Sequence, residues 1–172
     1  FELEIIMAYN EDTRVKIPAI LHLLRLGYKY ISLKNAKWDI ETNIFKDIFF
    51  DALTNINKGV EQDGLQRLYE NITLALDNED LGKAFYETLL SNEIRLIDFE
   101  NFNNNSFHVV TELTCKNGED EFRPDITLLI NGMPLVFIEV KKPNNKEGIL
   151  AERSRINTRF QNHKFRKFIN IT

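Results

Sequence analysis

Three side chains near the middle of the sequence have the types and spacing that metal-dependent phosphodiester chemistry requires. Asp125 follows Pro124, and after thirteen intervening residues come Glu139 and, two positions further on, Lys141. Mg²⁺ prefers oxygen ligands and is usually held by one or two carboxylates together with waters and substrate phosphate oxygens. Asp125 and Glu139 would supply the carboxylates, and the backbone carbonyl of Val140 would add a third oxygen. The sequence therefore predicts a divalent-cation site beside a phosphodiester.

Lys141 lies two residues after Glu139, so in a strand both side chains point to the same face. A lysine beside a metal-bound water can orient that water or, as a neutral amine, deprotonate it, and as an ammonium it can offset charge on the scissile phosphate. The alternative is a solvated strand end, with Asp125 capping the turn after Pro124. The apolar segment before Glu139 favours the metal site, because charged groups ending a buried strand are unfavourable unless something binds them.

Two apolar segments joined by Asn131-Gly132 must position these side chains, and their pattern predicts a β-hairpin. A strict two-residue loop would place Asp125 opposite Ile138, and the two carboxylates would then point to opposite faces of the sheet. A shared metal ion requires Asp125 opposite Glu139. We therefore predict either a three-residue loop spanning 131–133 or a bulge within the hairpin.

The segments around these residues resemble the nuclease segment of type I restriction enzyme R subunits, within the PD-(D/E)xK nuclease superfamily. They are Phe122-Arg123-Pro124-Asp125, Asn131-Gly132-x-Pro134-Leu135-Val136 and Ile138-Glu139-x-Lys141-Lys142-Pro143. A second stretch, residues 10–14 followed by Leu24 and Gly27-Tyr28, resembles the opening helix of that domain. The resemblance implies an α/β fold with a restriction-endonuclease-like mixed sheet flanked by helices. It also implies an endonuclease that cleaves duplex DNA with Mg²⁺, for which Mn²⁺ can substitute.

The resemblance implies roles for two further residues. In many nucleases of this superfamily a first-helix glutamate joins the metal shell, and the matching position here is Glu11, although Glu11 or the adjacent Asp12 would equally cap a helix. Arg14 would pair with Glu11 or contact DNA. R subunits also carry a helical Gln-x-x-x-Tyr motif near the active site, which corresponds to Gln161. Phe165 replaces the tyrosine, so the hydroxyl of that motif is missing.

The net charge of −4 hides a strong asymmetry along the chain. Residues 141–172 carry nine Lys or Arg against two Glu, a net charge of +7, whereas residues 1–140 carry −11. A basic segment beginning beside a metal site is typical of a surface that binds a phosphate backbone; the alternative is a solvated helix face. The candidate DNA contacts in this segment are Lys142, Arg153, Arg155 and Arg159.

A chain of 172 residues with 43% hydrophobic residues predicts a single domain, 1–172, with a sizeable core. Its single cysteine, Cys115, is typical of a reducing cytoplasm, and no apolar run is long enough to cross a membrane. The phosphate-binding loop of ATPases is absent from the sequence. We expect a piece of a longer protein. The resemblance implies an ATP-driven translocase elsewhere in that protein, and methyltransferase and specificity subunits as partners.

Two alternative functions remain at this stage. One is another nuclease of the same superfamily, of the repair or resolvase type. The other is a catalytically idle domain whose basic helix only binds DNA or docks a partner.

Hydrophobic periodicity and turn residues predict the elements that surround the hairpin. Asp80 is a candidate cap for the fourth helix, and residues 103–105 read as a hairpin loop. The predicted helices are 12–26, 43–56, 61–76, 80–91 and 147–168, and the predicted strands outside the hairpin are 28–33, 94–100 and 106–114.

Overall fold

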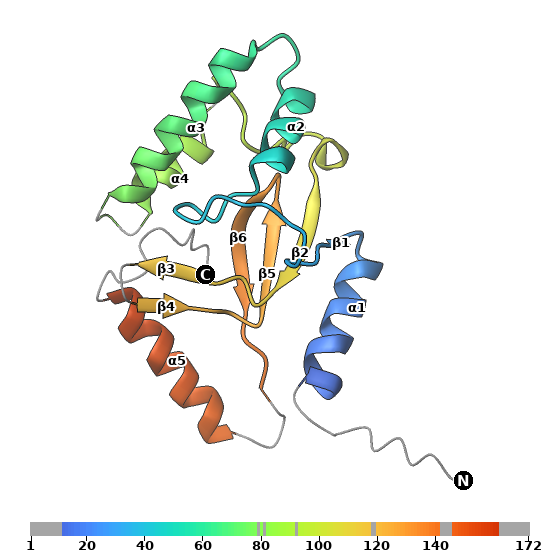
Figure 1. Ribbon diagram of the computed structural model, residues 1–172, viewed down its shortest axis with the longest axis vertical. Helices are drawn as coiled ribbons and strands as arrows, with labels where there is room; N and C mark the ends of the chain where they lie inside the picture. The colour runs from blue at the N-terminus through green and yellow to red at the C-terminus, as the bar shows by residue number, and fades with distance from the viewer. Residues whose placement is uncertain are drawn as a thin grey trace.

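A four-stranded mixed β-sheet forms the centre of the protein and confirms the predicted α/β class (Figure 1). The computed structural model describes residues 12–161 apart from 79, 81, 92, 118–119 and 142–145. The strand order is β1-β2-β5-β6; β1 runs parallel to β2, and the other neighbouring pairs are antiparallel. The strands of this sheet are β1 (Lys29–Tyr30), β2 (Phe107–Thr111), β5 (Ile126–Ile130) and β6 (Met133–Ile138).

Helices cover the sheet at positions close to those predicted. Figure 1 shows α2, α3 and α4 gathered at the end of the sheet where β5 turns into β6, with α1 and α5 towards the other end. None of the helices in the described part of the chain has the length and apolarity needed to cross a bilayer. The bounds are η1 (Asp12–Lys16, a π-helical turn), α1 (Ile17–Arg25), α2 (Lys46–Ile56), α3 (Gln62–Asp77), α4 (Lys83–Leu89) and α5 (Lys146–Gln161).

Apolar side chains at helical spacing explain how these helices attach. Leu23 of α1 packs with Val109 and Leu128 on one face of the sheet. In α3, Leu65 and Ile72 are buried in the core that covers the turn end of the sheet. The predicted cap of α4 is confirmed, because the carboxylate of Asp80 accepts hydrogen bonds from the first backbone N–H groups of that helix.

The β5–β6 hairpin combines a two-residue turn with a bulge. Ile130 pairs with Met133, and Asn131 and Gly132 both have positive φ, 52° and 77°, as a type I′ turn requires. The register then shifts, so that Leu129 pairs with Pro134 but Leu128 pairs with Val136. The extra residue is Leu135. The bulge alternative predicted from the sequence is thus confirmed, and the three-residue loop is wrong.

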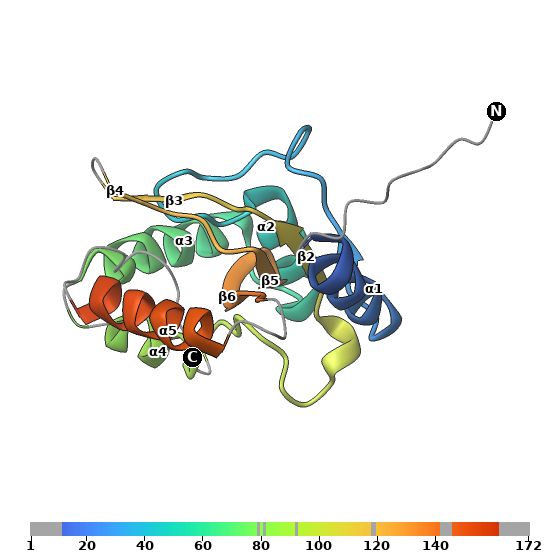
Figure 2. The ribbon, with the colours of Figure 1, turned by 90° about the horizontal axis from the view of Figure 1, so that it is seen from below.

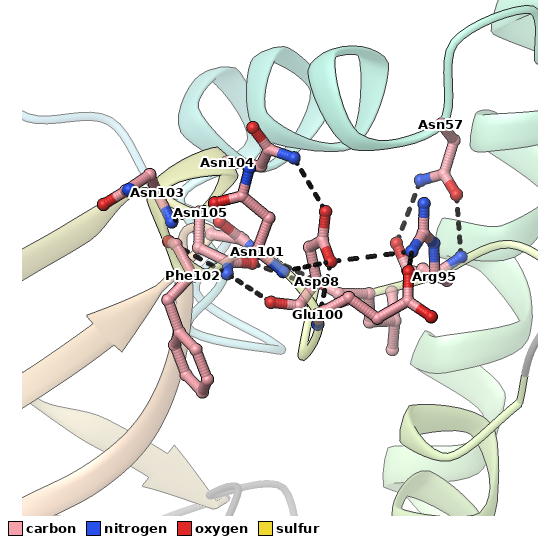
Figure 3. A network of polar contacts seen from close by, with 11 residues as sticks. Asn57, Arg95, Asp98, Glu100, Asn101, Phe102, Asn103, Asn104 and Asn105 are labelled. Atoms are coloured by element: carbon pink, nitrogen blue, oxygen red, sulfur yellow. Dashed lines mark hydrogen bonds and ion pairs between the residues drawn. The ribbon is translucent and has the colours of Figure 1, made fainter.

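A polar network replaces the strand predicted at residues 94–100, and that prediction is wrong (Figure 3). Asn105 accepts a hydrogen bond from the N–H of Asp98 and donates one to its carbonyl, so side chains satisfy backbone groups that a strand would pair with a neighbour. The carboxylate of Asp98 accepts from the N–H groups of Glu100 and Asn101. The expected loop at residues 103–105 is mostly a 3₁₀-helix, η2 (Phe102–Asn104).

A second, two-stranded sheet was not predicted. It consists of β3 (Cys115–Asn117) and β4 (Asp120–Phe122), and it leads directly into β5 (Figure 2). The ring of Phe122 packs edge-on against Phe137 of β6, with 5.1 Å between centroids. This small sheet therefore covers the part of β6 that comes just before Glu139.

Gly132 → Ala should destabilise the protein strongly, because the turn end of the hairpin sits directly on α2. A Cβ at Gly132 would lie 2.7 Å from the carbonyl oxygen of Phe45 and 2.9 Å from the nitrogen of Phe49. Gly59 → Ala is the matched control, since Gly59 also has a positive φ but open space around it. We expect about 1–2 kcal/mol of destabilisation for the control and a clearly larger loss for Gly132 → Ala in urea unfolding. Equal losses would contradict this packing.

Candidate metal site at the end of the hairpin

The bulge brings Asp125 and Glu139 together. Ile126 pairs with Ile138, so continuing the register by one residue places Asp125 opposite Glu139 and on the same face of the sheet. The N–H of Val140 donates a 2.9 Å hydrogen bond to Oδ2 of Asp125, which holds the two chain segments together beyond the last ladder pair. Asp125 comes just before β5 and Glu139 just after β6, so both residues lie at the end of the hairpin opposite its turn.

The carboxylate of Glu139 lies in an unfavourable position for an anion. Its side chain is 10% exposed, and Oε1 is buried without a hydrogen-bond donor among the described residues. Burial and the adjacent charge of Asp125 raise the pKa of Glu139 to about 7; the charge of Glu152 raises it further, and Lys141 opposes the rise. The positive charge of Lys141 therefore does not offset the effects of burial and of Asp125 on the carboxylate of Glu139.

Lys141 lies between two glutamates. Its Nζ is 3.8 Å from Oε2 of Glu139 and 3.6 Å from Oε2 of Glu152, which lies on α5. These residues line a cleft of about 550 Å³ between β6 and α5, whose walls include Phe137 and Arg153. The helix α5, which follows β6 in the chain, therefore contributes Glu152 and Arg153 to the candidate site at the end of the strand.

Lys16 lies beside Asp125 on the other flank of the pair. Its ammonium is 3.7 Å from Oδ1 of Asp125 and 2.9 Å from Oε1 of Glu112, and its side chain is 10% exposed. Glu112 adopts a φ of 57°, which is uncommon outside glycine, and its N–H donates to the carbonyl oxygen of Asp125. The ammonium of Lys16 is thus a second positive side chain next to the site, and Glu112 adds a turn with a positive φ beside it.

Sequence reasoning missed Lys16 and Glu152, and only Lys16 had a signal in the sequence. Lys16 falls on the same helical face as Ile20 and Leu23, and a lysine on an apolar face needs a buried partner. Glu152 lies four residues before Ile156, on the face that α5 turns towards the protein.

The other predicted site residues divide into three groups. Arg14 and Arg153 are exposed, and Arg153 lines the cleft. Arg155 is exposed but donates from Nε to Oε1 of Glu152 at 2.7 Å. The side chains of Arg159 and Gln161, on the last turn of α5, and residues Glu11, Lys142 and Phe165 lie outside the described part of the chain.

The residues that the structure describes fit a hard divalent cation. Asp125 and Glu139 offer oxygen ligands from opposite strands, and the unsatisfied Oε1 of Glu139 is the buried acceptor such an ion would use. In the described ranges no group of three or more Asp, Glu, His or Cys side chains forms a metal site. A cation would therefore need the two carboxylates together with oxygens from the backbone, water or phosphate. The backbone carbonyl of Val140 is the predicted backbone ligand.

Comparisons of the sequence with known proteins find a matching family and named relatives. A sequence model of the family described as type I restriction enzyme R protein N terminus matches residues 8–171. The chain is 32% identical over 165 residues to a Methanocaldococcus jannaschii protein named "Putative type I restriction enzyme MjaIXP endonuclease subunit", an alignment covering 80% of this chain and 16% of that protein. It is 27% identical over 137 residues to the type I restriction enzyme HindI endonuclease subunit of Haemophilus influenzae, covering 69% of this chain and 13% of that protein. Both relatives are thus several times longer than this chain.

Glu139 → Gln should stabilise the metal-free protein at pH 8. A folded-state pKa of about 7, above the ordinary value of 4.5, means that the folded state binds more protons, so this group's contribution to stability falls as pH rises from about 4.5 to 7. We expect a gain of about 1–2 kcal/mol at pH 8, after allowance for partial solvation, and little difference at pH 4.5. Urea unfolding in the presence of a chelator measures it.

The exposed Glu93 provides the control, and Glu93 → Gln should change stability little at either pH. A Glu139 → Gln protein that is less stable than wild type at pH 8 would contradict the unfavourable placement of this carboxylate.

Proposed function

The chain belongs to the family of type I restriction enzyme R protein N termini, and from this we propose that it is the Mg²⁺-dependent endonuclease domain of an R subunit. It would hydrolyse phosphodiester bonds of duplex DNA. The observation that carries the proposal is the pair Asp125 and Glu139, which a bulge brings onto one face with Lys141 beside them. Relatives named as endonuclease subunits support the same function.

Asp125, Glu139 and the carbonyl of Val140 would hold the metal ion, which supplies charge to polarise the scissile phosphate and lower the pKa of a water nucleophile. As an ammonium, Lys141 would orient that water and offset negative charge on the phosphate; only as a neutral amine would it instead take the proton of the water. The buried surroundings of Glu139 strengthen these electrostatic interactions by excluding water. Lys16, 3.7 Å from Oδ1 of Asp125, would help to orient that carboxylate.

DNA would approach along α5 and its basic segment. Arg153 is exposed on the wall of the cleft that contains Glu139 and Lys141, which suits a contact to a phosphate near the scissile bond. Lys142, Arg159 and Arg14 remain proposed phosphate contacts, and Gln161 a proposed active-site residue. Arg155 would contact DNA only by sharing its guanidinium with Glu152.

The whole protein would act as part of a restriction complex in the cytoplasm. We propose that the longer R subunit binds ATP and translocates DNA through domains absent from this chain, and that methyltransferase and specificity subunits are its partners. Cleavage would then follow translocation and be independent of sequence at the cut. No base-specific contact is needed at the site for this activity.

Asp125 → Ala and Glu139 → Ala in the intact R subunit should each abolish DNA cleavage by the assembled complex. Loss of either carboxylate removes one of two side-chain ligands, so both variants should also lack the Mn²⁺ site that we expect wild type to show by calorimetry with duplex DNA present. Glu93 → Ala provides the exposed-glutamate control for both measurements. DNA binding should survive in both variants, because phosphate contacts supply most of it.

A wild-type R subunit that shows no Mn²⁺ site, or an Asp125 → Ala complex that cleaves at the wild-type rate, would contradict the nuclease proposal. That outcome would favour a domain that only binds DNA or docks a partner.

A further inference from the structure

Glu152 occupies a position in α5 that a glutamate rarely takes. Between residues 147 and 158 of this helix only Gly148, Glu152 and Ile156 are partly buried, and they follow one another at intervals of four. They therefore form the line along which α5 contacts the rest of the protein. The Glu152 side chain is 13% exposed, and an anion on such a line is unfavourable unless it is paired.

The two oxygens of Glu152 have different partners. Oε1 accepts from the guanidinium of Arg155, one turn along the helix, with 2.7 Å to Nε. Oε2 lies 3.6 Å from the ammonium of Lys141. Arg155 thus orients the carboxylate, and the oxygen that remains is directed at the lysine of the proposed active site.

Lys141 depends on this contact once Glu139 binds a cation. In the structure its ammonium has two anionic neighbours, Glu139 at 3.8 Å and Glu152 at 3.6 Å. A divalent ion held by Glu139 would offset the charge of that carboxylate and repel the ammonium. Lysine has a flexible four-carbon side chain and would move towards solvent unless another anion held it. Glu152 is the anion in place to do so.

The described contacts do not make Glu152 a third metal ligand. Its two oxygens are occupied by Lys141 and Arg155, and among the described residues no set of three acidic, histidine or cysteine side chains forms a metal-binding group. If Glu152 acts through Lys141, replacing it should leave the metal affinity unchanged. If Glu152 binds the ion, replacing it should lower the metal affinity.

We infer that Glu152 is a positioning residue that holds Lys141 in the active site while the metal ion is bound, and that it couples α5 to the chemistry. This inference rests on the proposed nuclease function. It assigns α5 a role in catalysis beyond contacting DNA, because a displacement of the helix would move the partner of Lys141.

The test uses the intact R subunit in its assembled complex, with Glu152 → Gln, Glu152 → Asp and the control Glu147 → Gln, an exposed glutamate in the first turn of the same helix. Glu152 → Gln should lower kcat for DNA cleavage about 10- to 100-fold, as loss of residues that orient an active-site group does. KM for DNA, ATP hydrolysis and Mn²⁺ affinity by calorimetry should stay unchanged. Glu152 → Asp, which keeps the charge, should recover part of the rate, and Glu147 → Gln should match wild type.

A direct structural readout accompanies the kinetics. In crystals of the Mn²⁺-loaded wild-type subunit, Nζ of Lys141 should remain within about 4 Å of the Glu152 carboxylate, the usual ion-pair limit. In Glu152 → Gln the lysine should be displaced.

Three results would overturn the inference. The first is cleavage by Glu152 → Gln at the wild-type rate. The second is a loss of Mn²⁺ affinity in Glu152 → Gln like that expected of an Asp125 variant, which would make Glu152 a ligand. The third is a Lys141 that leaves Glu152 when Mn²⁺ binds. The variant Asp125 → Asn distinguishes a failure of this inference from a failure of the proposed function. If Asp125 → Asn still cleaves DNA, the nuclease proposal fails. If Asp125 → Asn is inactive and Glu152 → Gln cleaves normally, only the role of Glu152 fails.

Discussion

The register between β5 and β6 is the constraint on which the candidate site depends. Side chains alternate between the faces of a strand, so one residue more or less between the turn and Glu139 decides whether its carboxylate faces that of Asp125. The bulge at Leu135 supplies that residue. Leu135 is buried in the core shared with α2 and α3, and Gly132 contacts the start of α2, so the register is held from the turn end of the hairpin.

The apolar core and the candidate site lie at opposite ends of the hairpin. Among the described residues the largest apolar cluster packs α2, α3 and α4 against the turn end of the hairpin, where Figure 1 shows these helices, whereas Asp125 and Glu139 lie at the opposite end of β5 and β6. At the site, burial and charge repulsion raise the pKa of Glu139, while Lys16 and Lys141 flank the pair from opposite sides. A rigid hairpin can keep such an unfavourable pair in place, and unfavourable, strongly perturbed carboxylates are typical of functional sites.

The sequence predicted those parts of the fold that follow from local patterns. Apolar periodicity located α2 and α3, and the Asn131-Gly132 turn with the spacing of the two carboxylates was enough to require an irregular hairpin. The strand expected at 94–100 was wrong because Leu96 and Ile97 are buried in a segment whose backbone hydrogen bonds are made by the side chains of Asp98 and Asn105, which periodicity does not reveal.

Long-range contacts at the site were beyond local patterns in the same way. Lys16 is 96 residues from Glu112 in sequence, and only the packing of α1 against the sheet brings them together. Glu152 reads as an ordinary charged residue of a polar helix until α5 is placed beside β6. The candidate site residues of the hairpin were found from the sequence, whereas the residues that contact them, Lys16 and Glu152, needed the tertiary structure.

The most direct test of the two-carboxylate site is anomalous diffraction from crystals of the protein soaked with Mn²⁺. The account predicts one strong peak between Asp125 and Glu139, within coordination distance of an oxygen of each. A peak elsewhere on the protein, with none between these two carboxylates, would contradict the claim that the hairpin register exists to build a metal site.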